Sequence, residues 1–72
     1  MRVIKTLDHP NGRERVVIFQ RENGTFGFDW FKFDAEEQAW CMWGLDSHAI
    51  VDSAETAERE ARSRLPGFSE AP

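Results

Sequence analysis

The sequence predicts an α+β fold: a four-stranded antiparallel meander sheet with one C-terminal helix packed on one face (ββββα). Three observations carry this prediction. Asn11-Gly12 and Asn23-Gly24 each separate two apolar segments, and Asn-Gly is favoured in tight β-hairpin turns because both residues tolerate a positive φ. Residues 24–33 form the most aromatic segment of the chain, with rings at both odd and even positions. Residues 53–65 instead have the spacing of an amphipathic helix.

The predicted strands are segments in which β-branched and aromatic residues concentrate, and they cover residues 2–8, 13–21, 24–33 and 39–45. The two Asn-Gly pairs join the first three strands. A polar connection over residues 34–38 joins the last two. These four strands form an antiparallel meander. Residues 49–51 are predicted to add a short extended segment before the helix.

The helix is predicted to begin at Asp52 or Ser53, because either side chain can accept hydrogen bonds from the first free backbone N–H groups. A narrow apolar stripe at helical spacing is formed by Ala54, Ala57, Ala61 and Leu65. Pro66-Gly67 is expected to end the helix. The sequence therefore predicts one domain over residues 1–68, with residues 69–72 as a frayed C-terminal tail.

Two-residue turns at both Asn-Gly pairs would fix which side chains share a face of the sheet. They would place Leu7 opposite Val16 and Phe19 opposite Phe28, and a four-residue loop at 35–38 would place Phe33 opposite Trp40. One face would then be almost continuously apolar, formed by Ile4, Val17, Phe19, Phe28, Trp30, Cys41, Trp43 and Leu45. The other face would carry Val3, Leu7, Val16, Ile18, Phe31, Phe33, Trp40 and Met42, interrupted by polar residues and glycines.

We expect the helix to cover the continuous face, since its alanine stripe allows close approach to large rings. Cys41 would then be a buried small hydrophobic residue. The other face keeps an exposed apolar patch, and such patches usually mark interfaces. The candidate interface consists of Phe31, Phe33, Trp40 and Met42.

Phe26-Gly27-Phe28 resembles the aromatic RNP1 element of RNA-recognition and cold-shock domains, in which rings stack on bases. The resemblance covers about eight residues and implies a surface for single-stranded nucleic acid. Gly24 and Thr25 stand where that element has basic and glycine positions, and Asp29 stands where an aliphatic residue is usual. The predicted meander also differs from the βαββαβ order of RNA-recognition domains.

Composition bounds the possible functions of the chain. The 72 residues carry a formal net charge of −4, which argues against a general affinity for nucleic acid or for anionic membranes. No apolar segment is long enough to span a bilayer, and no signal peptide is recognisable. The single cysteine suggests a reducing compartment, so we expect a cytoplasmic location.

The sequence also lacks the patterns of catalytic and cofactor sites. It has no Cys/His spacing of a structural zinc site and no phosphate-binding loop, so we expect neither a metal nor a cofactor, and no enzyme activity. The leading hypothesis is a small interaction module that forms a homodimer through the aromatic face or an edge strand, with an unknown protein partner as a further possibility. One alternative is a single-stranded nucleic-acid binder that uses the same rings. Another is a small-molecule site with Gly27, Asp29 and Gly44 as the floor of a groove.

Overall fold

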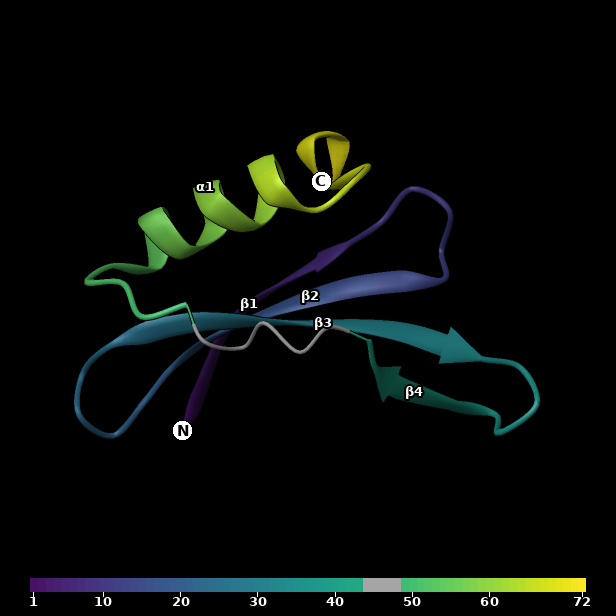
Figure 1. Ribbon diagram of the computed structural model, residues 1–72, viewed down its shortest axis with the longest axis horizontal. Coiled ribbons are helices and arrows are strands. Elements are labelled where there is room, and N and C mark those ends of the chain that lie inside the picture. Colours follow the sequence, from purple (N-terminus) through teal and green to yellow (C-terminus); the bar gives the residue numbers. More distant parts are fainter. Residues whose placement is uncertain (44–48) are drawn as a thin grey trace.

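The computed structural model of the chain describes residues 1–43 and 49–72 (Figure 1). Within these residues, four strands form one antiparallel sheet in the order β1-β2-β3-β4, and a helix packs on one of its faces. The strands are β1 (Arg2–Asp8), β2 (Glu14–Gln20), β3 (Phe26–Asp34) and β4 (Ala39–Met42). Helix α1 spans Ala54–Arg64, and a short 3-10 helix, η1, spans Phe68–Glu70. The predicted fold class and order of elements are confirmed.

The first and third turns give the predicted strand pairing. Leu7 lies opposite Val16 across the first hairpin, and Phe33 lies opposite Trp40 across the third. In the third turn the Asp34 carboxylate accepts hydrogen bonds from the backbone N–H groups of Glu36 (2.9 Å) and Glu37 (3.3 Å). This bonding satisfies backbone donors that would otherwise be unpaired in the connection.

The second turn is longer by one residue than predicted, and this changes the sheet. The backbone N–H of Arg21 donates to the carbonyl of Thr25 (2.7 Å), so the loop contains three residues and ends in Gly24 with a φ of 91°. Phe19 therefore lies opposite Gly27 rather than Phe28. A shift by one residue exchanges the faces of β1 and β2 relative to β3. The assignment of Val17 and Phe19 to the helix-covered face was wrong.

The core therefore contains Leu7, Val16 and Ile18, which were predicted to lie on the sheet face away from the helix. Its buried members are Leu7, Val16, Ile18, Phe28, Ala57, Ala61, Phe68 and Ala71. The prediction for β3 was correct, since Phe28 is buried under the helix and Trp30 packs against the core. In β1 a bulge between Val3 and Lys5 changes the pairing once more, so that Val3 rather than Ile4 lies opposite Phe19.

The helix begins and faces the sheet as its sequence predicts. Ser53 is the N-cap, and its hydroxyl accepts a hydrogen bond from the backbone N–H of Thr56 (3.1 Å). Ala57 and Ala61 are fully buried against the sheet. After the helix, Gly67 has a φ of 84°, which a residue with a Cβ adopts only with strain. A Cβ there would also collide with the His9 ring.

The C-terminal segment contacts the first turn and the helix. Phe68 is fully buried and packs edge-on against the His9 ring, with 5.2 Å between ring centroids. The Arg62 guanidinium donates hydrogen bonds to the backbone carbonyls of Phe68 (3.1 Å) and Ala71 (2.6 Å). η1 and Ala71 thus lie at one end of the core, while the predicted domain boundary at residue 68 and the fraying of residues 69–72 stay predictions.

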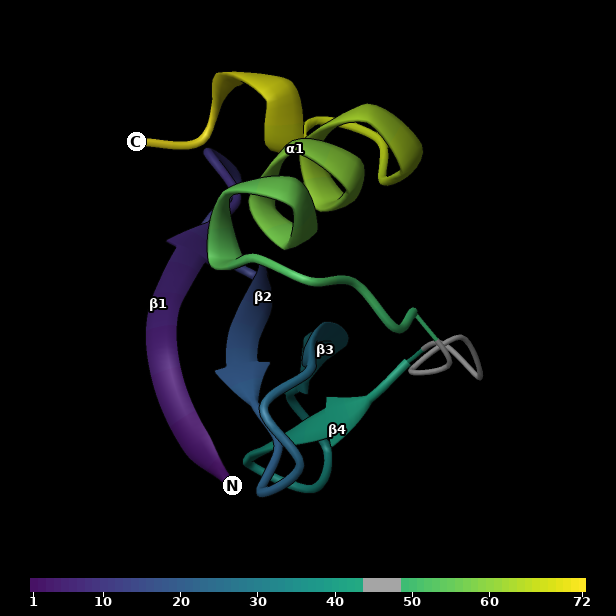
Figure 2. The same ribbon diagram turned by 90° about the vertical axis from the view of Figure 1, so that its left-hand side faces the viewer.

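Just before the helix, the chain runs beside the first residue of β3. Phe26 and Val51 exchange two backbone hydrogen bonds (2.8 and 3.0 Å), which confirms the short extended piece predicted near Val51. The turn of the β3–β4 hairpin lies at the opposite end of β3 and extends beyond the end of α1 (Figures 1 and 2). The helix thus covers β1, β2 and the first part of β3, while β4 lies away from it.

Candidate interaction surface

The sheet face turned away from α1, which we call the open face, is the largest candidate site. By the observed register it carries Val3, Thr6 and Asp8 of β1, Arg15, Val17 and Phe19 of β2, Gly27, Asp29, Phe31 and Phe33 of β3, and Trp40 and Met42 of β4. Arg13 pairs with Phe33 just before β2 begins and continues this face. Helix α1 lies on the other side of the sheet (Figures 1 and 2). At one end of the open face, Arg21 and the Ala49 carbonyl lie over Phe19 and Gly27.

The four residues of the candidate interface lie together at one corner of the open face. Phe31 lies opposite Met42, and Phe33 lies opposite Trp40 with its ring edge-on at 5.6 Å. Phe33 is 39% exposed and Met42 is 55% exposed, while Phe31 and Trp40 are half-buried. The structure thus brings all four side chains together on one surface, as the third hairpin predicted. Their role in binding stays a prediction.

Arginine side chains cover part of the rings on this face. The Arg15 guanidinium lies 3.9 Å from the centre of the Trp40 ring, and its Nε lies 3.4 Å from the Asp8 carboxylate. The Arg21 guanidinium lies 4.9 Å from the centre of the Phe19 ring and donates hydrogen bonds to the carbonyls of Phe26 and Ala49 (both 3.2 Å). A cation over an aromatic ring is attracted to it and shields it from water.

The sequence reasoning missed these arginines. One signal was available: Arg13 and Arg15 stand at alternating positions, and residues i and i+2 of a strand share a face. The sequence did not show which face of the sheet these arginines share, because that depends on the length of the second turn.

Asp29 lies near the centre of the open face, opposite Val17. Its Oδ1 atom is buried and has no hydrogen-bond partner among the described residues. Burial raises the pKa of the Asp29 carboxyl, and the charge of Arg21 offsets only part of that effect. Asp29 is therefore a carboxylate that the fold holds in an unfavourable environment at neutral pH.

Gly27 does not form the floor of a groove. A Cβ at this position would meet Arg21 Nη2 at 2.8 Å, the Ala49 carbonyl at 2.9 Å and the Phe19 ring at 3.0 Å, so the space above the glycine is filled. Gly44, the third residue of the predicted groove, lies outside the described residues, as does Leu45. The described part of the open face thus offers a small molecule a surface of side chains rather than a groove over Gly27.

We expect Asp29→Asn to raise the thermal stability at neutral pH. The raised pKa means that the folded state binds this proton more tightly than the unfolded chain does, so stability falls as pH rises from 3.8 through the raised pKa. The asparagine does not ionise. Melting temperatures of the two proteins should therefore differ most at neutral pH and converge in acid. A variant that is less stable than the wild type at neutral pH would show that the ionised carboxylate is stabilising.

The opposite side of the β3–β4 hairpin carries a second, smaller set of exposed groups. The Lys32 ammonium lies 4.0 Å from the centre of the Trp43 ring, and Trp43 is 56% exposed. Cys41 lies opposite Lys32 and is exposed. The expectation that Cys41 is buried was wrong, because the helix ends before it reaches β4. These residues border an open depression of about 420 Å³, lined also by the acidic third turn.

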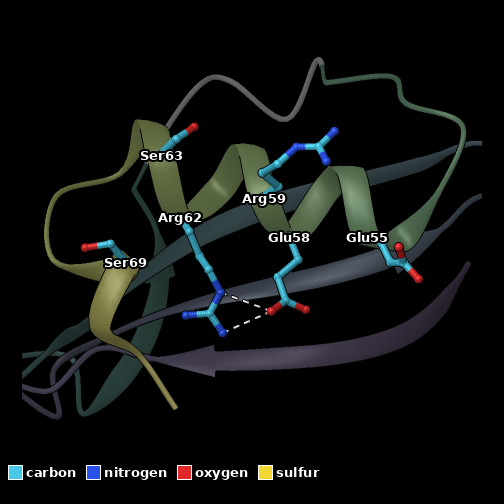
Figure 3. A pocket seen from close by; sticks show the side chains of 6 residues that line it. All are labelled: Glu55, Glu58, Arg59, Arg62, Ser63 and Ser69. Atoms are coloured by element: carbon cyan, nitrogen blue, oxygen red, sulfur yellow. Dashed lines mark hydrogen bonds and ion pairs between the residues drawn. The ribbon is translucent and has the colours of Figure 1, made fainter.

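A depression of about 460 Å³ on the outer side of α1 is lined by six residues, of which Glu58 and Arg62 bind each other (Figure 3). Arg62 donates to the Glu58 carboxylate (3.0 Å), which also pairs with Lys5 of β1 at 3.2 Å. Burial would raise the pKa of Glu58, but the hydrogen bonds and charges of Lys5 and Arg62 outweigh it and lower that pKa. This network ties β1, α1 and the C-terminal segment together, so we interpret it as structural.

In the described part of the chain, no three His, Cys, Asp or Glu side chains gather in a way that could hold a metal ion. No helix among residues 1–43 and 49–72 has the length and apolar character to cross a bilayer. Comparison of the chain with protein-family models, with curated proteins and with solved structures finds no match.

Proposed function

We propose that the protein is a small interaction module that binds a second copy of itself through the open face. The observation that carries this proposal is the cluster of Phe31, Phe33, Trp40 and Met42, which leaves Phe33 39% and Met42 55% exposed on a surface that the helix does not cover. Contiguous apolar surface of this kind is typical of protein interfaces. A chain of this size also has few other sources of stability, so burying these rings would stabilise it.

The charges of the open face favour a second copy over nucleic acid. Arg13, Arg15 and Arg21 contribute three positive charges, and Asp8 and Asp29 contribute two negative ones. The negative net charge of −4 therefore belongs to other surfaces. Two nearly balanced faces can approach without strong repulsion. A nucleic acid requires a clear excess of basic groups, which this face does not provide.

The edge strands are weaker candidates for self-association. The bulge between Val3 and Lys5 interrupts the free edge of β1, and the other edge strand, β4, has only four residues. Bulges and short edge strands are features that reduce pairing between sheets. We therefore assign self-association to the open face. A single cysteine fits a reducing compartment, and the location that we propose is the cytoplasm.

Phe33→Glu tests this proposal, with Trp43→Glu as the matched control. Both variants place a carboxylate on the β3–β4 hairpin at an exposed ring, but Trp43 lies on the side with Lys32. In sedimentation experiments at micromolar concentration, we expect the wild type and Trp43→Glu to form dimers and Phe33→Glu to be a monomer. The melting temperature of the wild type should rise with protein concentration, since the dimer is favoured by mass action.

A wild type that remains a monomer and melts independently of concentration would contradict the proposal. If such a monomer also bound single-stranded oligonucleotides in a salt-dependent manner, the rings of the open face would be assigned to base stacking instead. If the monomer bound neither itself nor oligonucleotides, a different protein partner would become the favoured occupant.

A further inference from the structure

The area that a stable dimer needs is larger than the four-residue cluster can supply. A specific interface buries about 800 Å² on each partner, which is about a sixth of the accessible surface of 4900 Å² of this chain. At 39% and 55% exposure, Phe33 and Met42 offer on the order of 100 Å² each, given roughly 150–250 Å² for a large side chain. The half-buried Phe31 and Trp40 offer less. Other surface must therefore take part.

Apolar surface continues across the open face toward its opposite corner. Val3 of β1 is 57% exposed, and Val17 of β2 is half-buried between Val3 and the cluster. Phe19, opposite Val3, is nearly buried beneath the Arg21 guanidinium. Arg15 lies between Asp8 and Phe31 in the register, and its guanidinium lies 3.9 Å from the centre of the Trp40 ring. Apolar groups and arginines thus extend across the face around Asp29, and aromatic and arginine side chains are enriched at interfaces.

We infer that the dimer interface extends across all four strands of the open face, from Met42 on β4 to Val3 on β1, with Asp29 enclosed at its centre. This inference rests on the proposed self-association and defines its extent. A second copy is the occupant because both partners bring the same nearly balanced set of charges and the same apolar surface. A cluster-only contact would leave Val3 and the exposed part of Asp29 uncovered and would bury too little area for a stable pair.

Enclosure of Asp29 has a consequence that a cluster-only interface lacks. Within the described part of the chain its Oδ1 atom has no hydrogen-bond partner, and a second copy would remove the remaining water from the carboxylate. Desolvation of an ionised group costs free energy, so the neutral Asp29→Asn variant should form a tighter dimer. Val3→Glu should have the opposite effect, because it buries a new charge at the far corner.

The test measures dimer dissociation constants of the full chain for the wild type and four variants, Phe33→Glu among them. The only thiol of the chain, Cys41, is exposed on the side of β4 away from the open face, so a fluorophore there reports on dilute samples. We expect Val3→Glu to raise the dissociation constant at least about tenfold and Asp29→Asn to lower it several-fold at neutral pH. Trp43→Glu, outside the interface, should leave it unchanged.

The outcomes separate the two proposals. If Phe33→Glu dissociates the dimer while Val3→Glu and Asp29→Asn leave the constant unchanged, the interface is confined to the cluster and this inference is wrong. If the wild type does not dimerise, the proposed function itself fails. Val3 is largely exposed, so Val3→Glu should keep its fold. A far-ultraviolet circular dichroism spectrum and a melting curve in dilute solution check that loss of dimer is not loss of folding.

Discussion

Ala57→Asp is expected to unfold the protein. Ala57 is fully buried in the core, on the helix that packs on β2 and β3. An aspartate at this position would bury a charge without a partner, which destabilises a fold by about 3–5 kcal/mol. A domain of this length has only about 4–10 kcal/mol of stability in total. Far-ultraviolet circular dichroism should therefore show an unfolded or largely unfolded chain at room temperature.

Arg59→Ala is the control for this experiment, because Arg59 lies on the exposed side of the same helix. Its removal should change the free energy of unfolding by no more than about 0.5 kcal/mol. Equal and small effects of the two substitutions in urea or thermal unfolding would mean that the helix presents a different side to the sheet.

The second large effect is expected for Phe68→Ala. The Phe68 ring is the largest fully buried side chain of the core and contacts the His9 ring. Truncation of a buried phenylalanine to alanine costs about 3–5 kcal/mol, because contacts are lost and a cavity remains. We expect a melting temperature lower by well over ten degrees, since about 1 kcal/mol corresponds to 4–8 °C in a domain of this size.

Ser69→Ala provides the comparison in the same 3-10 helix, because Ser69 is exposed and should tolerate the change. If Phe68→Ala were as stable as Ser69→Ala, the C-terminal segment would not belong to the core. The earlier expectation of a frayed tail would then be the better description of the protein in solution.

The local signals in the sequence predicted the strands, the helix and their order, but only part of which side chains lie on each face of the sheet. Hairpins follow from Asn-Gly pairs, and the helix follows from Ser53 and the alanine stripe, because these preferences act within a few residues. Whether the turn at Gly24 contains two or three residues is decided by packing. Both turns suit the same dipeptide, yet only the longer one turns Val16 and Ile18 toward the helix.

In the candidate site, too, the features that depend on local sequence were predicted and those that depend on packing were not. Phe31, Phe33, Trp40 and Met42 were correctly grouped because they depend only on the third hairpin, whose register was right. The arginines above the rings and the exposure of Cys41 were missed, since they depend on the second turn and on where the helix ends. Phe68 was missed for another reason: one aromatic residue after Pro66-Gly67 has no periodic pattern around it.

The contact between His9 and Phe68 also bears on how the protein folds. It joins the first turn of the chain to a segment near its last residues, so the core can close only when both are present. Long-range closure of this kind slows folding. During synthesis the N-terminal strands emerge first. Phe28 therefore stays exposed until residues 54–71 have been synthesised and can cover it. We therefore expect chains shortened before Phe68 to be recognised by chaperones as unfinished.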